Sequence, residues 1–314
     1  MFMKKRVLVV GANGFIGYNL VNELISNEIP VTALIKINTD TTNLKKIGCY
    51  NIIRTNNFED PTVLRTLSLS QPNFIVNCTW EKNKDLGLQF ENTQNLLSLL
   101  KLAKKINSNH FINLGSYLEY GIYKNNINEE SFTTPISEFG KLKLAHSNLL
   151  FEIAKSFNMK ASHLRLSNVY SLYKPENLVF HNLIKLINGG SNSIEPINIK
   201  KTDFIFVSDV CRAIIAIMKS NAEGIFNIGS GEAYPIETLI KMIIQQLNSS
   251  FIPEFKKNKK AKDYFLNINK IYRNTGWKPS ISIWNGLSLI IQEEKFKNPN
   301  SYENFTSTIR SMYK

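Results

Sequence analysis

Short apolar runs and longer amphipathic segments alternate along the first half of the chain. The runs that are typical of buried strands are Arg6–Val10, Pro30–Ile35, Phe74–Asn77, Phe111–Leu114 and Ser162–Leu166. The segments with apolar residues at helical spacing are Tyr18–Ser26, Gln89–Ile106 and Ser137–Phe157. In the last of them, apolar residues recur three and four positions apart and form one stripe along a helix. Strands that alternate with helices predict an α/β fold with a parallel, doubly wound sheet.

The pattern becomes less regular from about Tyr170. Short strand-like runs, several prolines, Gly189-Gly190 and two further helical segments follow. No low-complexity linker and no internal repeat separates the two parts. We therefore expect one domain over residues 1–170 and a smaller C-terminal lobe over residues 171–314 that is interleaved with it.

A glycine-rich turn joins the first predicted strand to the first helix. The segment Gly11-Ala12-Asn13-Gly14-Phe15-Ile16-Gly17 directly follows the apolar run. Glycines at these places allow a tight turn, a close approach of the backbone to a pyrophosphate, and close packing of helix on strand. The amides and the positive dipole end of the helix would then hold the anion. The turn predicts a Rossmann fold that binds a dinucleotide through Gly11, Asn13, Gly14, Phe15, Ile16 and Gly17.

The turn and several later motifs resemble the extended short-chain dehydrogenase/reductases that act on nucleotide sugars. After the GxxGxxG spacing of the turn, these motifs are Asp60-Pro61, Asn92 to Leu97, Gly115-Ser116 with Tyr120-Gly121, Leu164 to Tyr170, Asp203 to Val210, Phe226 to Gly231 and Thr275 to Pro279. The resemblance covers almost the whole chain. The Gly115 to Gly121 motif is similar to that of enzymes that reduce a 4-keto-6-deoxy sugar. The resemblance implies NAD or NADP as cofactor, a nucleotide-diphosphate sugar as substrate, and a C-terminal lobe that binds this substrate.

The resemblance also implies a catalytic group, and one position departs from the family pattern. In the family, a Tyr and a Lys four residues later lie on one helix face, and a Ser or Thr binds the same sugar oxygen as the Tyr. Ser116 matches the serine, and Lys143 matches the lysine that holds the nicotinamide ribose and lowers the pKa of the phenol. Phe139 stands at the position of the Tyr. A benzene ring has no proton to exchange, so the family mechanism does not carry over intact.

Three explanations of Phe139 stay open. In the first, the residue was engineered to trap a substrate, and in the second, the protein has lost catalysis and kept binding. In the third, another group donates the proton, either Tyr117, which is beside Ser116, or Lys143 through a water molecule. Reduction should tolerate the missing phenol better than epimerisation, because the cofactor delivers hydride and the carbonyl oxygen needs one proton in a single direction.

Two further features bear on the cofactor and the reaction. Rossmann enzymes that choose NAD usually have an acidic residue at the end of the second strand, whereas here the strand runs into Lys36. A cation can pair with a 2′-phosphate, so we expect NADP, with NAD as the alternative. The family's 4,6-dehydratases place Asp-Glu after the Ser/Thr, but Tyr117-Leu118 follow Ser116, and Glu119 is displaced by two positions. We expect reduction of a nucleotide-linked 4-keto-6-deoxysugar for surface polysaccharide synthesis, with a 4-epimerase or a binding protein without turnover as alternatives.

Further site residues are carried over from the family. At the cofactor we expect Asn57, Phe58, Cys78, Thr79 and Asn92 in addition to the turn, Lys36 and Lys143. At the substrate we expect Trp80, Ser116, Tyr117, Asn168 and Lys262. Several of these residues could equally serve the fold alone, and His146 and Arg165 are expected to have packing or structural roles. Related enzymes dimerise through two helices of each subunit, which implies a homodimer through Gln89–Ile106 and Ser137–Phe157.

Composition and charge exclude several classes of protein. The chain is 43% hydrophobic and 20% charged, which suffices for a globular core. No apolar run approaches the roughly 20 residues that cross a bilayer, and the first strand is too short and lacks the cleavage site of a secretory signal. We therefore expect a cytoplasmic protein. The three cysteines and four histidines show neither a disulfide framework nor a metal-ligand spacing.

The net charge of +13 comes mostly from lysines that are spread over the chain. The densest cluster, Lys256 to Lys262, is typical of a solvated loop, or alternatively of an electrostatic funnel for a diphosphate-bearing substrate. No nucleic-acid-binding motif accompanies it, so we expect no nucleic acid as a partner.

Overall fold

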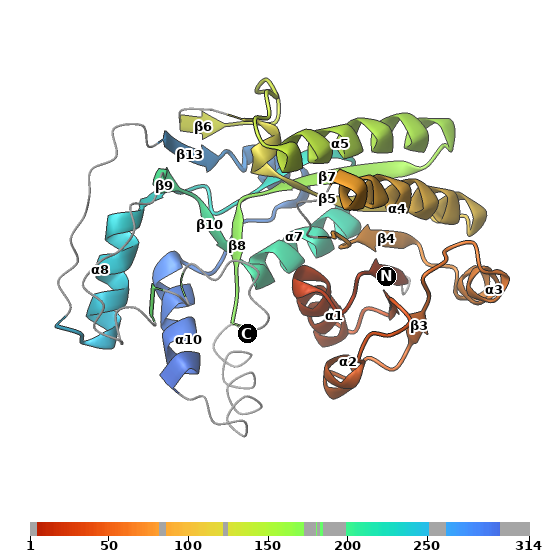
Figure 1. Cartoon of the computed structure of the whole chain (residues 1–314), viewed down its shortest axis with the longest axis horizontal. Coiled ribbons are helices and arrows are strands. Elements are labelled where there is room, and N and C mark those ends of the chain that lie inside the picture. The colour runs from red at the N-terminus through yellow and green to blue at the C-terminus, as the bar shows by residue number, and fades with distance from the viewer. Residues whose placement is uncertain are drawn as a thin grey trace.

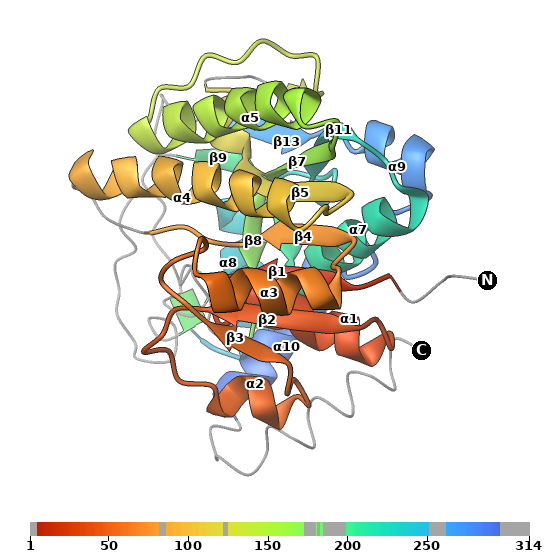
Figure 2. The ribbon, with the colours of Figure 1, turned by 90° about the vertical axis from the view of Figure 1, so that its right-hand side faces the viewer.

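A parallel sheet with helices on both faces forms the larger part of the structure (Figure 1, Figure 2). The computed structural model describes residues 5–81, 86–121, 125–172, 180, 183–184, 199–250 and 262–295. Among these residues, the strands of the main sheet are, in spatial order, β11 (Gly224–Ile228), β7 (Lys160–Leu166), β5 (His110–Ser116), β4 (Phe74–Asn77), β1 (Val7–Val10), β2 (Val31–Ile35) and β3 (Ile52–Arg54). All neighbours pair in parallel. The strand order changes direction at β1, as in a doubly wound Rossmann fold, which confirms the predicted fold class.

The helices divide between the two faces of this sheet. On one face, α1 (Phe15–Ser26) packs against α7 (Val207–Ser220). On the other face lie α3 (Pro61–Ser70), α4 (Leu86–Lys105) and α5 (Glu138–Ser156), and α2 (Thr42–Lys46) follows β2 at the edge (Figure 2). Asp60 starts α3 by accepting hydrogen bonds from the amides of Thr62 and Val63, and Ser137 starts α5 by accepting one from Gly140. Such caps satisfy amides that have no partner within the helix.

The central strand β1 explains why the core has two layers. Val7 and Val9 belong to the cluster on the side of α1 and α7, whereas Leu8 and Val10 belong to the cluster on the side of α3, α4 and α5. Successive side chains of a strand point to opposite faces of the sheet. A strand that is covered on both faces therefore has to be apolar at every position.

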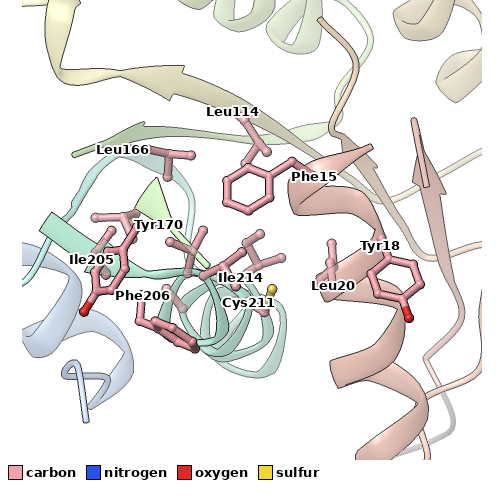
Figure 3. Close-up of a cluster of buried hydrophobic side chains, with 14 of the residues drawn as sticks. Phe15, Tyr18, Leu20, Leu114, Leu166, Tyr170, Ile205, Phe206, Cys211 and Ile214 are labelled. Atoms are coloured by element: carbon pink, nitrogen blue, oxygen red, sulfur yellow. The ribbon is translucent and has the colours of Figure 1, made fainter. Parts of the chain in front are cut away.

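The first helix is anchored at the carboxyl end of the sheet. Figure 3 shows Phe15 pointing from the start of α1 toward Leu114 of β5, while Leu20 further along α1 faces Cys211 and Ile214 of α7. This packing fixes the beginning of α1 next to the ends of β1 and β5. The position of the glycine turn, which precedes Phe15, follows from it.

The second half of the chain contributes to both parts of the molecule. A small sheet contains β12 (Tyr234–Pro235), β9 (Ile199–Thr202), β13 (Lys262–Leu266) and β6 (Asn125–Ile127), and β8 (Asn168–Tyr170) pairs with β10 (Phe204–Phe206). The helices α8 (Ile236–Leu247) and α10 (Ile283–Lys295) pack against each other, and α9 (Asn269–Thr275) packs against α7 and β11. From the second half of the chain, β11 joins the main sheet and α7 packs beside α1, whereas β6 of the first half joins the small sheet. None of the described helices has the length and apolar character to span a membrane.

Candidate active site

A cavity of about 1460 Å³ opens at the carboxyl edge of the main sheet. The ends of β1, β2, β5 and β7 line it through Val10, Leu34, Leu114 and Leu166. Ligands of open α/β sheets bind at this edge, where the strand order changes direction. A typical small-molecule pocket has about 300–1,000 Å³, so this cavity has room for more than one ligand.

The glycine turn forms one wall of the cavity. Gly11 has a φ of +76°, and its carbonyl accepts a hydrogen bond of 2.9 Å from the amide of Gly14. Gly14, the N-cap residue of α1, has no side chain that could cap the helix, and the first turn contains no acidic residue. The amide end of α1 is thus open toward an anion.

The residues of the turn have two different roles. Asn13, Gly14, Phe15 and Ile16 line the cavity together with Gly11. Gly17 is not among the described lining residues. A Cβ atom at Gly17 would lie 2.2 Å from the carbonyl oxygen of Gly11, so this glycine allows α1 to pack against the turn.

The positions of the family's catalytic group meet in the same cavity. Ser116 ends β5, and Phe139 and Lys143 lie one turn apart on α5; all three line the cavity. The Oγ of Ser116 accepts a hydrogen bond of 3.2 Å from the amide of Leu118. The Nζ of Lys143 donates one of 2.8 Å to the carbonyl of Leu114. Four segments that are distant in sequence therefore converge: the glycine turn, the end of β5, the segment after β4 and α5.

Trp80, in the segment after β4, contacts Phe139 and Lys143 of α5. The Lys143 Nζ lies 3.9 Å from the centroid of the Trp80 ring. The Phe139 ring meets the indole edge to face, with 4.9 Å between the centroids and 79° between the planes. A cation over an indole face and an edge-to-face ring pair are both favourable. The aromatic ring of Phe139 thus has a packing role at the place where the family has a phenol.

His146 of α5 is buried between Trp80 and α4. Its Nε2 is 3.0 Å from the Oγ1 of Thr93 on α4, and its ring is tilted against Trp80. Burial and the nearby charge of Lys143 lower the pKa of His146 to about 4. His146 is therefore neutral near pH 7 and packs α5 against α4.

Tyr117 and Glu119 follow Ser116 but face different surroundings. Tyr117 lines the cavity and also packs against Tyr120, Ile127 and Leu266. Glu119 is fully buried, and one of its carboxylate oxygens accepts a hydrogen bond of 2.8 Å from the amide of Ser116. Among the described residues that line the cavity, Tyr117 is thus the tyrosine beside Ser116.

Glu119 belongs to a buried charge cluster under the active site. Its oxygens lie 2.9 Å from the His163 Nε2 and 2.9 Å from the Arg165 Nε. Burial alone would raise the pKa of this carboxyl, but the contacts with His163 and Arg165 lower it to about 2. The Arg165 guanidinium also lies over the Tyr120 ring, 4.4 Å from its centroid. Glu119 and Arg165 therefore support the fold around Ser116 and do not reach the cavity.

The adenine end of a dinucleotide would lie near the ends of β2 and β3. Lys36 and Phe58 line the cavity there, and Cys78 and Thr79 line it after β4. Asn57 is not among the described lining residues, but its neighbour Asn56 is. The side chain of Asn57 accepts a hydrogen bond from the amide of Glu59 and shapes the loop before α3.

Lys36 forms an ion pair with Glu81, which follows Trp80. Asn92 does not line the cavity itself: its side chain accepts a hydrogen bond of 2.8 Å from the amide of Glu81 and donates one of 3.1 Å to the Glu81 carbonyl. Glu81 also lines the cavity and was not among the predicted site residues, and the same holds for Thr39, Thr55, Asn56, Glu91, Gln94 and Asn95. Gln94 and Asn95 lie in the motif of Asn92, which could have pointed to them.

Of the predicted substrate residues, Trp80, Ser116, Tyr117 and Asn168 line the cavity. Asn168 of β8 lines it, and its Nδ2 donates hydrogen bonds of 2.7 Å to the Thr202 Oγ1 and 3.0 Å to the Asp203 carbonyl. Lys262 begins β13, but its side chain and the rest of the basic cluster from Lys256 lie outside the described residues. Asn227 is buried in β11, where it donates to the Ile127 carbonyl and accepts from the Tyr120 hydroxyl.

Comparison with known proteins identifies the family of the chain. The model of the NAD dependent epimerase/dehydratase family matches residues 7–229. The chain belongs to this family. It is 25% identical over 315 residues to a dTDP-4-dehydro-6-deoxyglucose reductase of Escherichia coli, and the match covers 94% of this chain and 99% of the relative. These findings confirm the resemblance that the motifs indicated.

Other relatives carry different names. A putative UDP-glucose 4-epimerase of Methanocaldococcus jannaschii is 24% identical, with 93% of this chain and 99% of the relative covered. The crystal structure of a dTDP-glucose 4,6-dehydratase from Bacillus anthracis in complex with NAD has a TM-score of 0.80 at 20% identity and covers 96% of this chain and 99% of that one. The family and the fold are therefore established, whereas the relatives are named for different reactions.

Proposed function

We propose that this chain uses a nicotinamide dinucleotide to reduce a 4-keto-6-deoxysugar that is linked to a nucleotide diphosphate. The observation that carries the proposal is the convergence of the glycine turn, Ser116 and Lys143 on one cavity at the carboxyl edge of the sheet. The similarity to a relative named as a 4-dehydro-6-deoxyglucose reductase supports this substrate class.

The residues present fit a dinucleotide. The open amide end of α1 would hold the pyrophosphate. Gly11 allows the turn to pack closely on the segment after β4, because a Cβ atom there would lie 3.1 Å from backbone atoms of Cys78 and Thr79. Lys36 would lie at the adenine ribose, where its ammonium favours the 2′-phosphate of NADP. Lys143 would hold the nicotinamide ribose. The cofactor, once bound, supplies the hydride.

Position 139 offers no hydroxyl, so the proton for the sugar oxygen has to come from another group. Ser116 would bind the sugar oxygen, and Tyr117, the phenol that borders the same cavity, would supply the proton. Dehydration is disfavoured because Glu119 is fixed by Ser116, His163 and Arg165 and cannot remove a proton from the sugar. Trp80 and Asn168 would contact the sugar and the nucleotide, and Lys262 the diphosphate.

Two alternative functions have support in specific observations. A 4-epimerase is consistent with the relative from Methanocaldococcus jannaschii. A protein that binds a nucleotide sugar and NAD(P) without turnover is consistent with Phe139, whose ring packs against Trp80 and offers no hydroxyl. In every case we propose a homodimer through α4 and α5, which lie side by side on one face of the molecule (Figure 2).

The test is to measure binding and turnover with the purified chain. Titration calorimetry with NADPH and NADH should show binding of at least one, with NADPH the tighter ligand. Addition of a dTDP-linked 4-keto-6-deoxyglucose should then consume NADPH stoichiometrically. Epimer interconversion without net cofactor change would favour the epimerase, and binding of both ligands without turnover would favour the binding protein. A chain that binds neither dinucleotide would contradict all three.

A further inference from the structure

An ion pair crosses the cofactor end of the cavity. Lys36 directly follows β2, and Glu81 lies in the segment after β4. Because β1 lies between β2 and β4 in the sheet, the pair spans the carboxyl end of β1, where the glycine turn begins. Both side chains line the cavity. The ion pair thus lies at the place where the adenine half of a dinucleotide would enter.

The backbone on both sides of this ion pair is anchored. Asn92 holds both the amide and the carbonyl of Glu81, at 2.8 Å and 3.1 Å. After Lys36, the amide of Ile37 donates a hydrogen bond of 3.2 Å to the Asn56 Oδ1, and the amide of Thr39 donates one of 3.1 Å to the Lys36 carbonyl. The two charged side chains therefore project from fixed positions toward one another.

The charged residues that line the cavity show which group a 2′-phosphate of NADP would meet at the end of β2. Among the described residues that line the cavity, the cations are Lys36 and Lys143, and the carboxylates are Glu81 and Glu91. The Lys143 ammonium is held by the Leu114 carbonyl of β5 and the Trp80 ring. Among the described lining residues, Lys36 is therefore the cation at the end of β2 that can pair with a 2′-phosphate. Its ammonium already forms an ion pair with Glu81.

We infer that Glu81 determines cofactor preference by competing with the 2′-phosphate of NADP for Lys36; this rests on the proposed function. A phosphate monoester carries about −1.5 to −2 charges near pH 7. Glu81 weakens its binding in two ways, since the carboxylate occupies the Lys36 ammonium and repels the phosphate. The adenine ribose of NADH carries hydroxyls and no 2′-phosphate, so NADH binding depends little on the charges of Lys36 and Glu81.

The experiment compares Glu81→Gln with the wild-type chain by titration calorimetry with NADPH and with NADH at low salt. The exposed fractions of the Lys36 and Glu81 side chains are 67% and 39%, and such exposed pairs are weak. We therefore expect the NADPH dissociation constant of Glu81→Gln to fall about three- to fivefold, and that of NADH to change less than about twofold. Raising the salt concentration should reduce the difference, because exposed charges are screened.

Matched variants separate this effect from a general loss of negative charge. Glu91→Gln removes the same charge from the same cavity, and Glu91 forms no ion pair with a described residue; its NADPH/NADH ratio should stay closer to that of the wild type. In a Lys36→Met background, Glu81→Gln should improve NADPH binding much less, because the cation for which Glu81 and the 2′-phosphate compete is absent.

The possible outcomes distinguish the two proposals. Tighter NADPH binding in Glu81→Gln alone supports the role of Glu81. Binding of both nucleotides with an unchanged ratio in Glu81→Gln, or an equal gain in Glu91→Gln, overturns that role and leaves the proposed function intact. A chain that binds neither nucleotide in any variant overturns both.

Discussion

The ammonium of Lys143 lies between the carbonyl of Leu114, 2.8 Å away, and the face of Trp80, 3.9 Å from the ring centroid. Position 139, one turn earlier on α5, offers Lys143 only an aromatic ring, whose centroid is 5.7 Å from the Nζ. Trp80 and Leu114 therefore orient the lysine along the cavity wall. Trp80 comes from the segment after β4, so the geometry of the lysine depends on a segment far from α5 in sequence.

Replacing Trp80 by leucine should weaken dinucleotide binding. A desolvated cation–π contact contributes up to about 2 kcal/mol, and without it Lys143 is less well oriented toward the nicotinamide ribose. We expect about a three- to tenfold rise in the dissociation constant of NADPH for Trp80→Leu, measured by calorimetry. Trp80→Phe keeps a ring in place and should recover most of the loss. Equal affinities of Trp80→Leu and the wild type would show that the indole does not support the lysine.

Introducing the missing phenol should increase turnover. In Phe139→Tyr, the new hydroxyl would belong to a ring that is already next to Lys143, and a nearby cation lowers the pKa of a phenol. General acid catalysis contributes about 10²- to 10⁴-fold, so the rate of NADPH consumption with a 4-keto-6-deoxysugar substrate should rise by up to this factor. Phe139→Leu serves as the control and should gain nothing.

The same experiment separates the explanations of Phe139. Activity of the wild type that falls in Tyr117→Phe would identify Tyr117 as the proton donor. Activity that appears only in Phe139→Tyr would indicate a chain that binds without turnover. No turnover in any of these variants, despite binding of both ligands, would contradict the proposed reduction.

The regular first half of the chain could be predicted because its signals are local. The alternation of apolar runs with helical stripes gave the fold class, and the turn between Val10 and Phe15 placed the cofactor end of the cavity. The strands β3 and β11 were not among the predicted runs. β3 has three residues and is not fully buried, and β11 lies in the second half, where its buried residues follow no clear period.

The missed parts of the site depend on contacts between distant segments. Lys36 and Glu81 are 45 positions apart, and nothing local in the sequence shows that the strand order brings them together. Asn56 rather than Asn57 lines the cavity, because the side chain of Asn57 is bound to the amide of Glu59 in the loop after β3. The family resemblance supplied Ser116 and Lys143, but the packing of Trp80 between Lys143 and Phe139 had no signal in the sequence.

Gly17→Ala should destabilise the chain and impair dinucleotide binding together. The added methyl group would lie 2.2 Å from the Gly11 carbonyl oxygen, so either α1 or the turn has to move. Overpacking of this kind costs about 1–3 kcal/mol. Chemical denaturation should show this loss, and calorimetry a weaker affinity for NADPH. Ser26→Ala, at the exposed end of the same helix, should change stability by less than about 0.5 kcal/mol. An unaltered affinity in Gly17→Ala would mean that the turn does not hold the pyrophosphate.

His110 should make the stability of the protein fall as the pH decreases below about 6.5. The ring is fully buried, with Ser162 at 2.8 Å from its Nε2 and the Phe74 ring at 5.5 Å, and burial lowers its pKa from 6.5 to about 4. Between these values the unfolded chain binds a proton that the folded chain does not. The contribution of His110 to the free energy of unfolding is therefore fully present above pH 6.5 and decreases as the pH falls toward 4. One such histidine accounts for about 1–2 kcal/mol between pH 7 and pH 5. The midpoint of urea unfolding should therefore drop less between these pH values in His110→Gln than in the wild type. His146, whose pKa is lowered to about 4 in the same way, leaves a residual slope in that variant; parallel slopes of the variant and the wild type would show that His110 is not held neutral by the fold.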